Sequence, residues 1–304
     1  MPLATAIITD PQENGTRTLA AIGMMVLAMF ILCGMDTLGK VLAQHIPVTQ
    51  VVWGRYFFQF ALLLLAFPWL GWRGLVATAR PGTQIARGLL LAVGTLCLFM
   101  ALATVPLADA YAINFTSPFF VTILSIPLLG ERVGRLRWSA IAIGFIGVLV
   151  VIRPGLSGFD PLLLLPMITA ACFALYQVLT RMISGLPTER PLSMLFHIAV
   201  VGAAAQSVLV AFTWQPIPLV GWIGLTGMGA LSIAGHLILI RALGMASAVV
   251  LSPFAYTQII WALLFGYFLF GDIPDIWMII GCIIIVGSGL FVFYREAVRR
   301  RQSG

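Results

Sequence analysis

Charged residues are scarce in this sequence. Lysine and arginine (17) and aspartate and glutamate (10) together make up 9% of the 304 residues, whereas 61% of the residues are hydrophobic. The mean hydropathy is +1.06. Soluble domains carry about 25% charged residues. A surface with so little charge cannot be solvated by water, and we therefore expect it to face lipid.

Residues that carry enzyme chemistry are scarce as well. The three histidines lie on separate apolar segments, and no GxSxG, HExxH or phosphate-binding glycine loop occurs. The four cysteines stand singly in apolar runs, which predicts small buried side chains rather than disulfides or metal ligands: Cys33, Cys97, Cys172 and Cys282. We expect neither an enzyme nor a bound metal or cofactor, and no ATP-driven pump.

Long apolar runs fill almost the whole chain. Each is close to the roughly 20 residues that an α-helix needs to cross about 30 Å of hydrocarbon, and none shows the alternating pattern of a transmembrane β-strand. The short breaks between them carry proline, glycine and arginine. This pattern predicts an all-α membrane protein with ten transmembrane helices, at about residues 18–44, 47–69, 84–104, 107–129, 135–152, 161–183, 191–213, 217–240, 247–270 and 275–294.

The second half of the sequence repeats the first. The segment Met100–Val133, MALATVPLADAYAINFTSPFFVTILSIPLLGERV, recurs from Arg241 as RALGMASAVVLSPFAYTQIIWALLFGYFLFGDIP, at a shift of 141 residues. A period near half the chain length indicates two related units, which we place at residues 18–152 and 161–294. Five helices per unit is an odd number, so the second unit enters the membrane from the opposite side. The prediction is a 5+5 inverted repeat, an arrangement found in secondary transporters.

Loop arginines predict the orientation. If residues 1–17 form a cytoplasmic tail, the inside segments hold nearly all loop arginines and the outside loops hold only Arg153. The positive-inside rule then places both termini, including the basic tail at 295–304, in the cytoplasm, and we expect a multi-pass protein of the bacterial inner membrane. Arg87 and Arg181 lie near the inner ends of their helices, and we expect them to reach the lipid headgroups.

The partners follow from the same distribution of charge. The net charge of +7 belongs to loops and the C-terminal tail at the membrane surface, so it does not indicate nucleic acid. We expect a small-molecule substrate and the lipid bilayer as partners of a monomer or homodimer. Protons would join them as a coupling ion if a group inside the membrane titrates.

Three ionisable residues fall at membrane depth in the first two helices. Asp36 and Lys40 are four residues apart and share one helix face. Asp36 and Arg55 are each about nine residues from the turn at Ile46-Pro47, roughly 14 Å along a helix, and should lie at similar depth in the outer half of the membrane. Because an unpaired charge is costly there, we expect all three to face the bundle interior.

Two interpretations of these three residues remain open. In the first, Lys40 and Arg55 present cations to a substrate carboxylate, and Asp36 is their counter-ion or the site of an ammonium group or proton. In the second, the residues form a buried salt-bridge cluster that only holds the first helix to the second.

Uncharged candidates for a substrate site lie in the middle of the predicted spans, beside amides. This placement favours a cavity over a lipid-facing aromatic belt or simple core packing. The candidates are Trp53, Tyr56, Tyr111, Asn114, Tyr176, Gln177, Tyr256 and Gln258. His197 is a candidate for substrate binding or proton coupling, the alternative being a neutral buried histidine bonded to a hydroxyl. We expect a central pocket lined by the first, second, fourth, sixth, seventh and ninth helices.

Four further residues are candidates for gating or for helix shape. Pro118 and Pro253 each free a backbone carbonyl and can kink a helix that lines a cavity. Glu131 and its repeat counterpart Asp272 follow corresponding apolar runs on opposite sides of the membrane. We expect a structural or gating role for both rather than direct contact with substrate.

Several segments resemble a known family. The run NFTSPFFVTILSIPLLGERVGRLRWSAIAIGFIGVLVVIRPG, from Asn114, and its weaker copy LFGDIPDIWMIIGCIIIVGSGLFV, from Leu269, are similar to the EamA branch of the drug/metabolite transporter superfamily. The resemblance covers about residues 20–294 and implies the ten-helix fold and transport, but no particular substrate. The second repeat departs from the first by having Asp272 for Glu131 and Phe196 for Arg55, so the two halves are chemically unequal.

A narrower similarity concerns the residues around Asp36 and Lys40 and the segments WGRYFFQF (53–60), ARGLLLAVG (86–94) and LSMLFHIAV (192–200). They resemble bacterial transporters that take up S-adenosylmethionine, and also exporters of amino-acid-derived metabolites, including metallophores.

The expected function is secondary transport of a small polar or zwitterionic metabolite, either an amino acid or a derivative of one, by alternating access. The resemblance favours export. One alternative is import of S-adenosylmethionine or a similar metabolite. A passive channel is a second alternative, although channels usually show rings of one polar type rather than this mixture of aromatic and amide groups. A membrane-embedded enzyme is a third, for which the sequence offers no nucleophile with its base.

Overall fold

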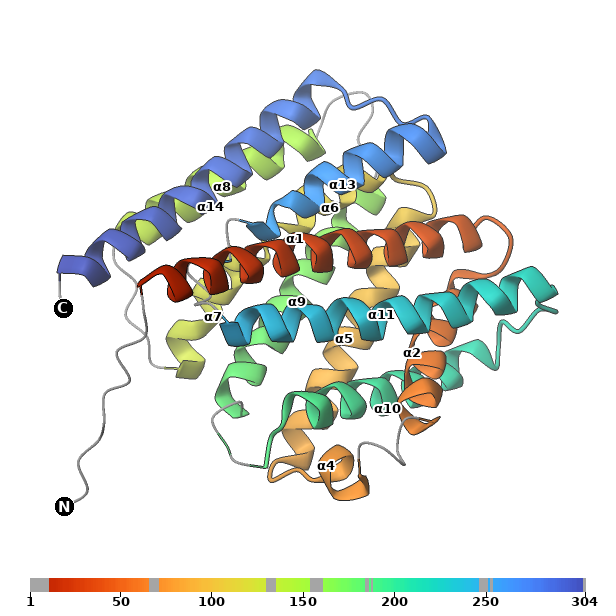
Figure 1. Ribbon diagram of the computed structural model, residues 1–304. Coiled ribbons are helices and arrows are strands. Elements are labelled where there is room, and N and C mark those ends of the chain that lie inside the picture. The colour runs from red at the N-terminus through yellow and green to blue at the C-terminus, as the bar shows by residue number, and fades with distance from the viewer. Residues whose placement is uncertain are drawn as a thin grey trace, which may run out of the picture.

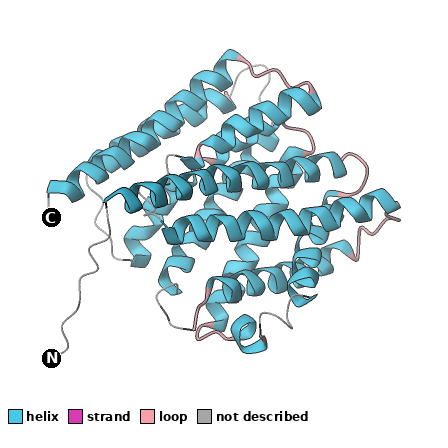
Figure 2. Ribbon diagram, in the orientation of Figure 1, coloured by secondary structure: helices cyan, strands magenta, loops and turns pink. Residues whose placement is uncertain are grey.

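The computed structural model describes residues 11–65, 71–129, 135–153, 161–183, 186, 188–245, 251 and 254–302. Every regular element within these residues is a helix (Figure 2). The helices of the first half are α1 (Pro11–Leu42), α2 (Val48–Leu65), α4 (Trp72–Val76), α5 (Pro81–Leu102), α6 (Leu107–Asn114), α7 (Ser117–Leu129) and α8 (Arg135–Ile152). Those of the second half are η1 (Pro161–Leu163), α9 (Leu164–Ile183), α10 (Pro191–Val210), α11 (Leu219–Met245), α13 (Thr257–Phe265), the π-helix η2 (Gly266–Phe270) and α14 (Ile276–Gln302).

These helices supply the ten predicted spans. In the described part of the chain, seven helical segments are long and apolar enough to cross a membrane, and three shorter apolar segments accompany them. The seven are Arg17–Ala43, Val48–Leu65, Pro81–Leu102, Leu107–Leu128, Pro161–Thr180, Pro191–Val210 and Leu219–Ala242, and the three are Ile141–Ile152, Thr257–Phe270 and Ile276–Phe291. The helices differ from expectation at both ends of the chain, where α1 begins within the predicted N-terminal tail and α14 runs on through the basic tail to Gln302. In addition, α4 occupies a predicted loop.

The two halves are interleaved, and their packing follows a two-fold pattern. α1 packs on α11, and the repeat counterparts of these two helices, α9 and α5, pack on each other. In the same way, the packing of α7 on α9 corresponds to the packing of α13 on α1. The packing of α5 on α10 corresponds to the packing of α11 on α2. α8 and α14, which end the two repeats, lie side by side at one edge of the bundle (Figure 1). These contacts recur with the halves exchanged, as an inverted repeat requires.

The fourth span of each repeat is interrupted at an equivalent position. α6 ends at Asn114 and α7 begins at Ser117, while α13 begins directly after a turn at Tyr256. Phe115 and Tyr256 occupy the same repeat position, and their ring centroids are 5.0 Å apart. Positions related by a two-fold axis touch only next to that axis, so the axis passes close to the two breaks.

The predicted kink residues have different outcomes. Pro118 lies in the first turn of α7, where its missing N–H removes no helical hydrogen bond, and the helix break lies just before it. Pro253 and Glu131 lie outside the described residues.

Helices α8 and α14 approach each other through glycines. A Cβ built on Gly281 would lie 2.8 Å from the carbonyl oxygen of Gly147 and 2.4 Å from Cγ2 of Val151. A Cβ on Gly147 would lie 3.0 Å from the carbonyl oxygen of Gly281. Lipid tails are as apolar as the helices, so association in the membrane depends on such close van der Waals packing. Gly287, on the exposed side of α14, has no heavy atom within 4 Å of a built Cβ.

We predict that Gly281→Ala lowers the melting temperature of the detergent-purified protein, whereas Gly287→Ala does not. The methyl group at 281 meets a backbone oxygen that cannot move aside, which costs about 1–3 kcal/mol by overpacking. The methyl group at 287 meets open space. Circular-dichroism melting compares the two variants, and equal melting temperatures would contradict a glycine-mediated contact.

Candidate functional site

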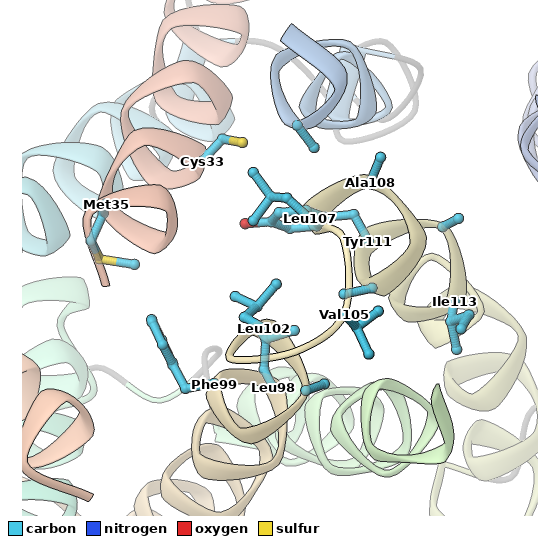
Figure 3. Close-up of a cluster of buried hydrophobic side chains, with 14 of the residues drawn as sticks. Cys33, Met35, Leu98, Phe99, Leu102, Val105, Leu107, Ala108, Tyr111 and Ile113 are labelled. Atoms are coloured by element: carbon cyan, nitrogen blue, oxygen red, sulfur yellow. The ribbon is translucent and has the colours of Figure 1, made fainter. Parts of the chain in front are cut away.

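The charged residues of α1 and α2 meet inside the bundle. Asp36 and Arg55 are 6% and 8% exposed, and Nη1 of Arg55 lies 3.9 Å from Oδ1 of Asp36. The Tyr111 hydroxyl donates a hydrogen bond of 2.5 Å to Oδ2 of Asp36. Figure 3 shows the Tyr111 side chain reaching from α6 toward α1. Asp36 and Arg55 thus both face the bundle interior, where their side chains meet.

The Asp36–Arg55 pair does not use all of its hydrogen-bonding atoms. Nη1 of Arg55 lies 3.5 Å from the Thr95 hydroxyl on α5, which shares a 2.8 Å hydrogen bond with the Tyr56 hydroxyl. Among the described residues, Oδ1 of Asp36 and Nε of Arg55 have no hydrogen-bond partner. Buried polar atoms are bonded in the great majority of cases. Two such atoms beside a loose ion pair are typical of a site that receives polar groups from water or another molecule.

The helix breaks add amide groups to this region. Asn114 is half-buried at the end of α6, and its Oδ1 has no hydrogen-bond partner among the described residues. Gln258 lies in the first turn of α13, a helix that packs against α6. The second repeat therefore contributes to a site whose charged groups come from the first. Tyr256 is buried at the break itself.

Lys40 points away from the Asp36–Arg55 pair. Its Nζ donates a 2.8 Å hydrogen bond to the carbonyl oxygen of Val105 and lies 3.6 Å from Oδ2 of Asp272. The ammonium group also lies 4.8 Å from the ring centroid of Phe270. The shared helix face with Asp36 thus does not bring the two charges to one partner. Instead Lys40 links the first repeat to the second at the end of the bundle that holds the α1–α2 turn, which we call the Lys40 end.

Trp53 lies in an aromatic cluster rather than beside the charged pair. Its ring stacks on Phe57 at 4.6 Å between centroids and meets Trp214 and Trp222 edge to face at 5.5 Å and 6.3 Å. Its Nε1 donates to the Ser207 hydroxyl at 2.9 Å, an exposed contact. This arrangement matches the aromatic packing that the sequence left open as the alternative for such residues.

The second-repeat candidates are also dispersed. Nδ1 of His197 lies 2.8 Å from the carbonyl oxygen of Ser193 on the same helix, so this nitrogen carries the proton. The Ser193 hydroxyl lies 3.4 Å from the same nitrogen, which fits the histidine-with-hydroxyl alternative. Gln177 is exposed and donates to the Ser117 hydroxyl at 3.4 Å. The half-buried Tyr176 ring lies against the guanidinium of Arg87, and Cζ of Arg87 is 5.0 Å from the ring centroid.

Two cavities lie away from the charged pair. One of about 560 Å³ is lined by Pro47, Val48, Thr49, Leu96, Met100, Leu209, Phe212 and Thr213. One of about 200 Å³ lies at the Lys40 end, lined by Pro106, Ala108, Asp109, Ala262, Leu263, Gly266, Asp272, Ile273, Pro274 and Asp275. Neither set of described lining residues includes Asp36, Arg55 or Tyr111. Of the polar residues expected to line a central pocket, Asp36 contacts both Arg55 and Tyr111 in this conformation.

A second buried polar cluster joins the repeats at the other end of α5, and it has no counterpart among the sequence-based candidates. Glu189, 4% exposed, accepts hydrogen bonds at Oε1 from the Thr78 hydroxyl (2.7 Å) and the Ala79 N–H (2.8 Å). Its Oε2 accepts one from Nε2 of Gln84 (2.5 Å). We call Thr78, Ala79, Gln84, Arg87, Thr180 and Glu189 the Glu189 clasp.

Arg87 belongs to this clasp and not to the membrane surface. It is 1% exposed, donating from Nη1 to Oε1 of Gln84 and from Nε to the Thr180 hydroxyl at 2.8 Å. The expectation that Arg87 reaches lipid headgroups is wrong, because α9 packs over it and supplies Thr180. The spacing of Gln84 and Arg87 on one helix face was the available signal. The Arg181 side chain lies outside the described part of the structure.

The Glu189 carboxyl is held ionised by its partners. Burial alone would raise the pKa of Glu189, but the hydrogen bonds from Thr78, Ala79 and Gln84 outweigh it and hold the pKa below its ordinary value. Hydrogen bonds to a charged acceptor are about twice as strong as neutral ones. The clasp is therefore a firm link between the α4–α5 segment and the residues before α10.

The comparison with protein families matches the two repeats separately. The profile described as "EamA-like transporter family" matches residues 19–153 and again residues 161–294.

Relatives of known name span nearly the whole chain. An S-adenosylmethionine uptake transporter of Rickettsia felis is 30% identical over 281 residues, which is 91% of this chain and 94% of the relative. A riboflavin transporter of Rhizobium johnstonii is 28% identical and covers 98% and 97%. A pseudopaline exporter of Pseudomonas aeruginosa is 28% identical and covers 86% and 92%. A crystal structure at 18% identity has a TM-score of 0.61 over 94% of this chain and 98% of its own, which shows a shared fold.

We predict that Asp36→Asn and Arg55→Gln are not additive in their effect on stability. Either substitution alone leaves the other charge buried without a counter-ion, at a cost of about 3–5 kcal/mol. The double variant removes both charges and should unfold at a higher temperature than the two single effects together imply. Melting of the four proteins in one detergent gives the coupling, and strictly additive shifts would show that the two groups do not interact.

The lowered pKa of Glu189 leads to a prediction about how stability depends on pH. The carboxylate stabilises the fold fully above its ordinary pKa of 4.5, and this contribution is lost as pH falls through the lower pKa of the folded state. The melting temperature of the wild type should therefore exceed that of Glu189→Gln at neutral pH, and the gap should shrink toward about pH 3. A gap that stays constant from neutral to acid pH would rule out an ionised Glu189 as the source.

Proposed function

The chain belongs to the EamA-like transporter family, and from that premise we propose that it carries a zwitterionic, amino-acid-derived metabolite across the membrane by alternating access. It is a transporter of the drug/metabolite transporter superfamily, not an enzyme. The observation that carries the proposal is the loose Asp36–Arg55 pair, in which Oδ1 of Asp36 and Nε of Arg55 have no hydrogen-bond partner within the described part of the chain.

A zwitterion supplies the groups that this pair lacks. An ammonium group can donate to Oδ1 of Asp36, and a carboxylate can accept from Nε and Nη of Arg55 in the bidentate geometry that guanidinium groups favour. The Tyr111 hydroxyl keeps Oδ2 of Asp36 occupied and so directs the free oxygen toward the substrate. Substrate binding thereby replaces a weak internal contact with two charge-assisted contacts.

Both ends of the bundle are closed by contacts between the repeats. At the Lys40 end the ion pair to Asp272 joins α1 to the segment after η2. At the other end Glu189 binds the α4–α5 segment. We assign Asp272 and Lys40 to the outer gate, with the clasp on the cytoplasmic side as the loop arginines predict. Two closed ends around a charged pair suit an occluded organic ligand better than a continuous pore.

The direction of transport stays a prediction. The relatives include one named for S-adenosylmethionine uptake and one named for pseudopaline export. We propose that the protein exports its substrate and that transport is coupled to protons. Asp36 is the proposed proton site, because Nδ1 of His197 is bonded within its own helix. A deletion strain that accumulates a metabolite inside and loses it outside supports export, and the reverse supports import.

We predict that Arg55→Ala abolishes transport while leaving expression intact, because the substrate carboxylate loses its partner. Arg153→Ala is the matched control, since Arg153 forms a more exposed ion pair with Asp275, and it should retain nearly full flux. Flux is measured in proteoliposomes with S-adenosylmethionine, methionine and riboflavin as probes. The account expects competition from compounds that carry both an ammonium and a carboxylate group. Wild-type flux in Arg55→Ala, or transport confined to riboflavin, would overturn it.

A further inference from the structure

We infer that Arg87 is a second carboxylate-binding station, which receives the substrate at the Glu189 end and weakens the Glu189 clasp as it does so. This inference rests on the proposed zwitterionic substrate. It assigns a ligand to a cation that the Asp36–Arg55 site does not use.

Arg87 is a buried cation whose direct partners, among the residues that the structure describes, are neutral. Its guanidinium donates to the Gln84 amide oxygen and the Thr180 hydroxyl and lies over the Tyr176 ring. The ion pairs found among the described residues do not include it. The nearest acid of the clasp, Glu189, is reached only through the Gln84 side chain.

A charge inside the membrane that is held by neutral groups is costly, and a charged partner would stabilise the Arg87 guanidinium further. A carboxylate offers two charged acceptors to a guanidinium, against the single neutral acceptor of Gln84. A structural role alone would be served better by direct contact with Glu189, yet all three hydrogen bonds recorded for Glu189 go to other groups. A substrate carboxylate would recognise the guanidinium of Arg87, because the described groups bonded to it are neutral and leave its charge unpaired.

The station lies on a line that leads to the central pair. Arg87 and Thr95 stand on the same face of α5, eight residues apart, which is roughly 12 Å along a helix. Thr95 contacts Arg55 and Tyr56. The Tyr176 ring lies under the Arg87 guanidinium. The two guanidinium groups thus lie at successive points along α5, Arg87 beside the Tyr176 ring and Arg55 beside the Thr95 hydroxyl, where a carboxylate can pass from one to the other.

Occupation of the station acts on the clasp through Gln84. The same amide accepts from Arg87 and donates to Glu189. A carboxylate that takes the guanidinium displaces the Gln84 oxygen, and the freed side chain no longer holds Oε2 of Glu189. Glu189 then keeps only Thr78 and the Ala79 N–H, so this end opens more readily when a carboxylate is bound.

Hydrogen exchange of the Ala79 amide tests the inference without knowledge of the natural substrate. The full-length protein in detergent at neutral pH is exposed to sodium acetate, to acetamide as its neutral isostere, and to sodium chloride at equal ionic strength. Acetate should accelerate exchange of the Ala79 amide at least threefold, and the other two should leave it unchanged. Equal exchange in acetate and chloride, or equal acceleration by acetamide, would overturn the inference.

Variants locate the effect. In Arg87→Gln the response to acetate should disappear, and in Gln84→Met exchange should be fast before acetate is added and gain nothing from it. Gln84→Met keeps the test decisive if Arg87→Gln does not fold. Arg55→Ala should retain the acetate response at Ala79 even though it abolishes transport, which separates this station from the central site. An acetate response that survives in Arg87→Gln or in Gln84→Met would contradict the assignment.

Discussion

Burial of charge in hydrocarbon is the constraint on which this structure depends. A lone charge there is costly, so each buried cation must find partners within the bundle. Lys40 finds Asp272 and the Val105 carbonyl, Arg55 finds Asp36, and Arg87 finds Gln84 and Thr180. Two of these partners, Asp272 for Lys40 and Thr180 for Arg87, come from across the repeat boundary. Holding charge inside the membrane and holding the two halves together are therefore partly the same task.

The scaffold is symmetric and its chemistry is not. Helix packing recurs with the halves exchanged, and Phe115 and Tyr256 mark the axis where equivalent positions touch. At the same shift of 141 residues, however, Arg55 corresponds to Phe196 and Arg87 to Met228. Both guanidinium groups thus belong to the first repeat. A symmetric frame can exchange inward and outward shapes, while the unequal charges give the path a fixed set of binding groups.

Much of the fold and part of the candidate site could be predicted from the sequence, and the features that could not be predicted have physical causes. Spans and repeats follow from long apolar runs and a fixed period, and the proximity of Asp36 and Arg55 follows from counting residues on both sides of one turn. The partner of Lys40 could not be found in this way, because Asp272 is brought to it by packing between the repeats. The burial of Arg87 was missed for the same reason, since α9 covers it. Trp53 shows that position along a span does not determine which neighbour a ring meets.

The central claim is that the two ends open one at a time around the Asp36–Arg55 pair. Double electron–electron resonance in liposomes measures this most directly, with one spin-label pair at Thr104 and Ile273 near the Lys40 end and another at Gly82 and Thr188 near the clasp, all exposed positions. Asp272→Asn should lengthen the first distance and leave the second short, and Glu189→Gln should do the opposite. Simultaneous lengthening of both distances in either variant would describe a channel and contradict alternating access.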